Sequence, residues 1–208
     1  MSAPREREMT APADDAPAGV DELGLEPAGF LVGDGAPHDD DLELGVSLAT
    51  VVIALTQAAA AALVVRDADA GFVRVPVEQR TQLSGRAETL AEHVADLCDG
   101  WPRIAVDEPR LGGLRGGELL LLALAAGPAL DRSVARVVRR ALSDEPLTIG
   151  GLIDLAGADL DTRLALALAW ERAEPLLARG LVHCADAEPT LTSVVAVAPW
   201  VVARLRRS

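Results

Sequence analysis

Lysine, asparagine and tyrosine are all absent from this 208-residue chain, so all 19 of its Lys or Arg residues are arginine. The codons of the three missing residues are A/T-rich, and we interpret their absence as the composition of a GC-rich bacterial genome. The Walker A nucleotide loop needs a lysine, so the sequence excludes that motif. Aromatic residues make up only 2% of the chain. A core must therefore be built mainly from alanine, leucine and valine.

Cysteine is also scarce, with Cys98 and Cys184 as the only thiols. They form no CxxC pair and show no Cys/His ligand spacing. Two cysteines do not make a disulfide scaffold, which favours a reduced, cytoplasmic protein. The first residues, MSAPREREMTAPADD, lack the apolar segment of a secretory signal.

The net charge of −13 is unevenly distributed. Residues 1–117 hold nine Arg and 21 acidic residues, whereas residues 118–208 hold ten Arg and 11 acidic residues. An acidic surface disfavours nucleic-acid binding, because affinity for phosphates depends on a basic surface. The nearly balanced second half leaves DNA binding open as an alternative.

The sequence contains no arrangement of residues that suggests catalysis. The GxSxG elbow of serine hydrolases is absent. The histidines of the chain are His38, His93 and His183. None of them has a partner nearby in sequence that indicates a triad or a metal site. The acidic run 39–41 lacks the spacing of a calcium loop. Three later carboxylates lie near expected helix ends, where capping explains them: Asp154, Asp159 and Asp161. We therefore predict a non-enzymatic protein with no cofactor and no metal.

Composition divides the chain into four parts. Residues 1–40 are predicted to be a disordered acidic leader, because they hold too few large apolar residues to offset the entropy of ordering. Residues 41–100 are expected to be a helical segment with a short β-like stretch at FVRVPV and a helix over 82–100. Residues 101–117, rich in Pro and Gly, are predicted to be a linker, and residues 118–208 a second folded region.

Residues 41–65 are long and apolar enough to be tested as a membrane span. Their small and polar residues recur every three or four positions and form one helical stripe: Glu43, Ser47, Thr50, Ala54, Gln57 and Ala61. The acidic flank at 39–43 also disfavours insertion. A buried helix, or a helix that mediates self-association, is therefore favoured over a membrane-associated protein.

The region 118–208 predicts two helices, a short helix, another helix, a β-hairpin and a last helix. The first helix is expected to end at Gly127-Pro128, and Asp131 to cap the next one. Gly180 should end the fourth helix, and Pro199 should sit in the first turn of the last. A helical body followed by a hairpin is typical of a winged-helix domain. The glycine-rich GGLRGGE ahead of this region is interpreted as a hinge, because Glu118 would repel an anion there.

The second of these helices carries an arginine stripe opposite its valines. Its members are Arg132, Arg136, Arg139 and Arg140. A solvated helix face is the favoured interpretation, since every exposed cation in this protein must be Arg. If the stripe has a partner, an acidic protein is favoured over DNA, and the leader of another copy would qualify.

Five segments carry a resemblance to a known family: ELLLLALAAGPALDRSVARVVRRAL, PLTIGGLIDLAG, PLLARGLVHC, TLTSVVAV and PWVVARLRR. They resemble the N-terminal region of a group of bacterial AAA+ ATPases, a variant winged-helix domain ahead of the ATPase core. The resemblance spans about 118–207 and involves apolar positions and turns, so no ATPase residue is carried over. It implies an adaptor that holds partners or substrates for an AAA+ ATPase, in settings that include contractile injection systems.

The sequence thus predicts a mainly α protein with a small β-hairpin, a winged-helix-like C-terminal domain, and a role in protein–protein interaction. The alternative is a DNA-binding winged-helix regulator, with its recognition helix at Ile149–Leu155 or 162–169. Direct base readout needs polar or basic side chains there. Arg163 is the only cation across 149–169, which disfavours that alternative.

Overall fold

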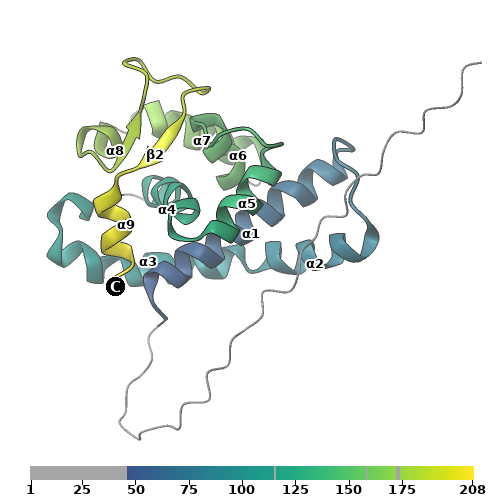
Figure 1. Cartoon of the computed structure of the whole chain (residues 1–208), viewed down its shortest axis with the longest axis horizontal. Coiled ribbons are helices and arrows are strands. Elements are labelled where there is room, and N and C mark those ends of the chain that lie inside the picture. Colours follow the sequence, from purple (N-terminus) through teal and green to yellow (C-terminus); the bar gives the residue numbers. More distant parts are fainter. Residues whose placement is uncertain (1–45, 115, 158, 172–173) are drawn as a thin grey trace, which may run out of the picture. The chain divides into compact units, whose positions relative to one another are not determined.

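The computed structural model describes residues 46–208 apart from residues 115, 158, 172 and 173 (Figure 1). The expected acidic leader, residues 1–40, lies outside the described residues. The described part is mainly helical and contains one antiparallel hairpin of two short strands. The predicted fold class, mainly α with a small β-hairpin, is therefore confirmed.

The first three helices are α1 (Leu48–Asp69), α2 (Val77–Glu88) and α3 (Leu90–Asp107). Ser47 caps α1 by accepting a hydrogen bond from the Thr50 amide. In Figure 1, α1 passes between α2 and α3 on one side and the later helices on the other, and it packs against both sets. Apolar residues along its length are buried, so the apolar segment predicted at 41–65 contributes a core helix.

The short strand expected at FVRVPV is absent, and this prediction was wrong. Phe72 and Val73 donate their amides to the Asp67 carbonyl and so close the end of α1. Pro76 then precedes the first residue of α2, where its fixed φ suits the start of a helix. Phe72 and Val77 are both exposed, so the apparent alternation of apolar residues corresponds to no buried sheet face.

The stretch expected to be a linker, residues 101–117, is largely folded, and this prediction was also wrong. Helix α3 continues through Gly100 and Pro102 to Asp107, and a 3₁₀ turn, η1, follows at Pro109–Leu111. Trp101 is buried, and its indole nitrogen donates to the Leu111 carbonyl at 3.0 Å. Burying such large side chains offsets the helix penalty of a single proline, since each contributes about 1.5–3 kcal/mol.

Two arginines hold η1 and the turn after it to the C-terminal part of the chain. The Arg110 guanidinium lies 3.9 Å from the centre of the Trp200 ring, a cation–π contact. Arg179 donates to the Gly112 carbonyl at 2.5 Å. Residues from α1 and α3 also share one hydrophobic core with the later elements. The expected regions 41–100 and 118–208 are thus not separated by a linker within the described residues.

The next helices are α4 (Gly116–Leu130) and α5 (Arg132–Ala141). The sequence predicted that α4 would end at Gly127-Pro128, but the helix continues to Leu130 and this prediction was wrong. Pro128 has no amide to donate to the Leu124 carbonyl, and the burial of apolar residues along α4 offsets the loss of this bond. Gly127 is buried where α4 meets α1: a Cβ there would lie 2.7 Å from Cβ of Thr56. The glycine therefore permits close helix packing.

The remaining helices are α6 (Ile149–Ala156), α7 (Leu160–Glu171), α8 (Glu174–Ala178) and α9 (Pro199–Leu205). Gly180 has φ +62° and follows the end of α8. Its amide donates to Leu177, and the Leu181 amide donates to Leu176, which is the paired pattern of a Schellman motif. The predicted helix stop at Gly180 and the predicted Pro199 at the first turn of α9 are both confirmed.

The hairpin consists of β1 (Val182–Cys184) and β2 (Val195–Val197), with Val182 opposite Val197. A third segment extends this sheet at its edge. The Val195 amide donates to the Leu147 carbonyl at 2.9 Å, and Thr148 forms a bridge with Val194. The helices, the hairpin and α9 follow in the order that the sequence predicts, whereas the edge segment at Leu147 and Thr148 was not predicted.

Candidate interaction surfaces

Helix α5 is held by its cap and by one apolar face. The Asp131 carboxylate accepts hydrogen bonds from the amides of Ser133 and Val134. The Ser133 hydroxyl also donates to it and, as the largest cause, holds the pKa of Asp131 below its usual range. Val134, Val138 and Ala141 are buried. The predicted cap and inward face of α5 are therefore confirmed.

The opposite face of α5 carries the arginine stripe predicted from the sequence. We call it the arginine face: Arg132, Arg136, Arg139 and Arg140. All four side chains are exposed. Among the described residues none of them forms an ion pair, whereas Arg66, Arg163 and Arg204 each pair with a carboxylate. The arginine face therefore projects four positive charges that form no ion pair, although Asp131 interacts electrostatically with Arg136.

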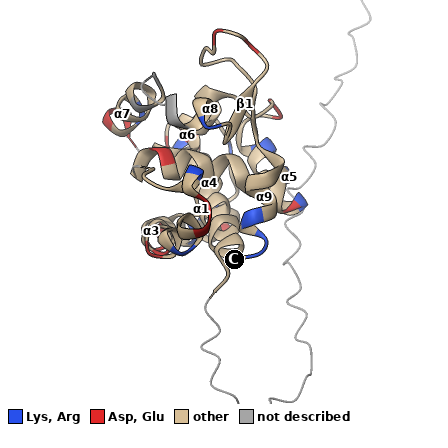
Figure 2. Cartoon of the chain, turned by 90° about the vertical axis from the view of Figure 1, so that its left-hand side faces the viewer, with Lys and Arg blue, Asp and Glu red and all other residues tan. Residues whose placement is uncertain are grey.

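The end of the chain lies near the start of the arginine face. Arg206 donates to the carbonyls of Ala129 and Leu130, at 3.1 and 3.4 Å, at the junction of α4 and α5. Arg207 is also exposed. Figure 2 shows the arginine-bearing parts of α5 and α9 on the same side of the view. These contacts were not predicted, because they join residues more than 70 positions apart.

Helices α6 and α7 follow one another in the chain, pack together and carry little positive charge. Thr148 caps α6 by accepting from the Gly151 amide. Asp159 accepts from the Thr162 amide before α7, and this bond is the largest cause that lowers the pKa of Asp159. Arg163 forms an ion pair with Asp154 at 3.2 Å. The single cation that the sequence placed in this region is therefore already neutralised.

The outer side of α7 carries a row of exposed leucines, which we call the leucine row. Leu160, Leu164 and Leu168 recur every fourth residue and are 62%, 54% and 53% exposed. Leu166 and Trp170, on the other side of the helix, are buried. Exposed leucines aligned on one helix face are candidates for burial against another molecule, because larger exposed apolar patches mark interaction sites. The spacing of four was visible in LALALAW, but the sequence alone did not show which leucines face inward.

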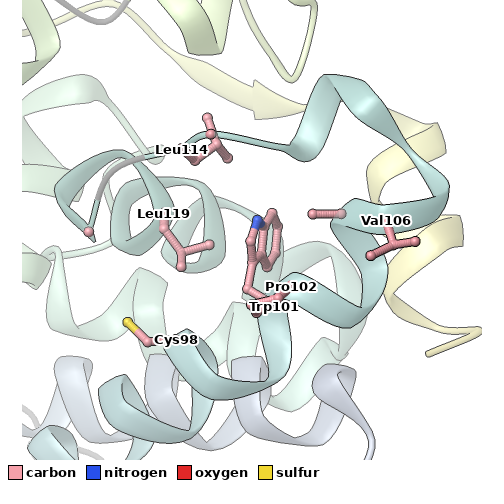
Figure 3. Close-up of a pocket in the computed structure, with 9 residues that line it drawn as sticks. Cys98, Trp101, Pro102, Val106, Leu114 and Leu119 are labelled. Carbon is pink, nitrogen blue, oxygen red and sulfur yellow. The ribbon is translucent and has the colours of Figure 1, made fainter.

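A groove lies beside the turn that follows α3 (Figure 3). It has a volume of about 470 Å³ and is lined mainly by apolar residues of α3, the following turn and α4: Cys98, Trp101, Pro102, Ala105, Val106, Gly113, Leu114, Gly116 and Leu119. Cys98 is the only nucleophilic side chain among them. Sequence reasoning missed this groove because it treated residues 101–117 as a linker.

A second cavity, of about 510 Å³, lies near the start of α6 and includes Arg66, Asp154 and Arg163 in its lining. Arg66 donates to the carbonyls of Asp154 and Gly157, at 3.3 and 2.6 Å. The two arginines in this lining are thus already engaged by protein groups. The cavity therefore presents charges that largely satisfy one another.

The other polar residues considered from the sequence are scattered. His93 lies 4.0 Å from Asp96 on α3, and His183 is exposed on β1, while His38 lies outside the described residues. Cys98 and Cys184 are both free thiols, and burial raises the pKa of Cys184. No group of three or more His, Cys, Asp or Glu residues suited to hold a metal ion occurs within the described ranges.

Helix α1 is the one described helix long and apolar enough to cross a membrane. Its most apolar stretch is 56% buried inside the protein, and Thr56 is fully buried with its hydroxyl donating to the Val52 carbonyl at 2.7 Å. The described packing therefore gives α1 a role in the core.

No protein-family model matches this sequence, and comparisons with curated proteins and with solved structures also find no match.

Proposed function

We propose that this chain is a non-catalytic protein-interaction module that docks a partner on the leucine row of α7. The observation that carries this proposal is the exposure of Leu160, Leu164 and Leu168 on the second helix of the α6–α7 pair. Leucines at this spacing are the usual anchors of helix-in-groove contacts. A partner with an apolar groove or helix face would remove them from water.

The place of the leucine row on the second helix of the α6–α7 pair distinguishes protein binding from DNA binding. In a DNA-reading helix–turn–helix, the second helix enters the major groove and presents polar or basic side chains to the bases. Helix α7 presents leucines there, and its one cation, Arg163, is paired with Asp154. These features support a protein partner over the alternative of a winged-helix transcriptional regulator.

The resemblance of residues 118–207 to the N-terminal region of bacterial AAA+ ATPases supplies a candidate partner. Under this proposal the chain acts as an adaptor in the cytoplasm and joins such an ATPase, or a contractile-injection-type assembly, to another protein. The burial of α1 in the core favours this function over a membrane-associated one.

Affinity capture with the full chain as bait tests the proposal. The variant Leu164→Glu/Leu168→Glu places two charges in the leucine row, and Phe72→Glu/Val77→Glu places two on exposed apolar positions elsewhere, 82% and 77% exposed. We expect a bacterial partner, such as an AAA+ ATPase, to be captured by the native chain and the control and lost from the α7 variant. Equal capture by all three proteins, or specific DNA binding through α7, would overturn the proposal.

A further inference from the structure

We propose that the arginine face of α5 is a second docking surface, and that its ligand is an acidic segment of a protein partner. The proposal involves Arg132, Arg136, Arg139 and Arg140 and does not depend on the leucine row. It adds a partner chemistry that the proposed function does not specify.

The first argument is the energetic cost of the arrangement. Arg132 and Arg136, and again Arg136 and Arg140, stand four residues apart, a spacing at which like charges destabilise a helix. Arg132 lies in the first turn, where the helix dipole disfavours a cation, whereas Arg139 and Arg140 lie in the last turn, where it favours one. Within the described structure no carboxylate forms an ion pair with these side chains, although the charge of Asp131 acts on Arg136. A ligand with negative charge would relieve this repulsion.

The second argument is the contrast with the other arginines. Arg80 pairs with Asp69, Arg110 with Glu108, and Arg204 with Asp107. Arg86 and Arg103 form no ion pair either, but neither has a second unpaired arginine on its helix, whereas α5 carries four within the described residues. The four charges are concentrated on a helix of ten residues, which makes a local positive field on a chain whose net charge is −13.

The third argument concerns the size and ends of the face. A helix of ten residues is about 15 Å long, which four or five residues of an extended peptide would span. Asp131 lies at one end, and the exposed Asp144 and Glu145 follow the other. A short acidic segment fits between these carboxylates. A nucleic acid, with about one charge per 1.7 Å of duplex, would extend over them and be repelled.

The experiment measures binding of fluorescein-labelled hexaglutamate to the full chain by fluorescence anisotropy at low ionic strength, with a hexaglutamine peptide as the uncharged probe. The test variant is Arg136→Glu/Arg140→Glu. The matched control is Arg86→Glu/Arg103→Glu, which changes the net charge equally at two exposed arginines of α2 and α3. Because the substituted side chains are exposed, we expect both variants to fold, and circular dichroism checks this. The milder Arg136→Gln/Arg140→Gln provides a second variant.

We expect hexaglutamate to bind the native chain, and hexaglutamine not to bind. The test variant should weaken binding about tenfold, as two attractive contacts become repulsive, while the control should change it by less than about twofold. Equal weakening by both variants would show a net-charge effect and overturn the proposal. Failure of hexaglutamate to bind the native chain would also overturn it, because the arginine face would then be only a solvated surface. Tighter binding of a 20-base-pair DNA duplex, lost in the same test variant, would also overturn it.

Discussion

Gly127 of α4 lies directly against Thr56 of α1. A Cβ at position 127 would stand 2.7 and 2.8 Å from Cβ and Cγ2 of Thr56, closer than side chains pack. Thr56 is fully buried and donates its hydroxyl to the Val52 carbonyl of its own helix. The contact therefore sets how closely two central helices approach, although the residues stand 71 positions apart.

Gly127→Ala should destabilise the protein. We expect the free energy of unfolding to fall by about 1–3 kcal/mol, because overpacking outweighs the better helix propensity of alanine. Urea denaturation measures this change. Gly85→Ala is the matched control: it lies in α2 with nothing within 4 Å of a new Cβ, so it should raise stability by about 0.5–1 kcal/mol. The Gly127→Ala cost should shrink in a Thr56→Ala background, and strict additivity of the two changes would contradict the contact.

The cap of α5 should make a pH-dependent contribution to stability. Asp131→Ala should lower the free energy of unfolding by about 1 kcal/mol at pH 7. Hydrogen bonds hold the pKa of Asp131 below its usual range, whereas an unfolded Asp titrates near about 3.9. The contribution is therefore fully present above that pH and is lost as the pH falls through the lower, folded-state pKa.

Urea denaturation of native chain and Asp131→Ala from pH 7 to pH 2.5 checks this dependence. The difference between the two proteins should shrink steadily as the pH falls below about 3.9. Asp131→Asn is the control, because asparagine caps a helix but does not titrate. A difference that stays constant across the range would show that the ionised carboxylate is not what stabilises α5.

The two thiols should differ in reactivity. Cys98 is exposed on α3, whereas Cys184 is half-buried, and burial followed by the negative charge of Asp186 raises its pKa. Because the thiolate is the reactive form, we expect Cys184 to react with an aromatic disulfide reagent at least about tenfold more slowly than Cys98 at pH 8. Cys98→Ala should remove the fast phase and leave the slow one. Loss of the slow phase instead would mean that the assignment of the two thiols is reversed.

Helix α1 should behave as a core helix during fractionation. Its buried face packs against α4 and α5, so we expect the chain to remain in the supernatant after cell lysis and after a carbonate wash. A genuine membrane helix would need detergent for its release. Recovery of the chain only in detergent would contradict the packing of α1 and favour the membrane-associated alternative.

Local signals in the sequence predicted the elements that depend on local chemistry. Asp131 capped α5 as expected, Gly180 ended α8 with a positive φ, and Pro199 began α9. Each of these residues acts through its own backbone geometry or through amides a few positions away. A prediction of this kind therefore needs no knowledge of the tertiary structure.

The errors occurred where distant contacts outweighed a local signal. Pro102 suggested a linker, but burial of Trp101 and Ile104 keeps α3 helical around it. Gly127 suggested a helix end, but it is the place where α4 meets Thr56. Neither contact can be derived from local propensity. The leucine row was overlooked for a related reason, since only packing shows that Leu166 faces inward and Leu164 outward.

Photo-crosslinking through α7 tests the central proposal most directly. A benzoylphenylalanine introduced in place of Leu164 in the producing cell, with one in place of Phe72 as the control, reports what touches each position under native conditions. We predict a discrete protein adduct at position 164 on irradiation, with none at position 72. An adduct with nucleic acid at position 164, or no adduct there at all, would contradict a protein-docking role for the leucine row.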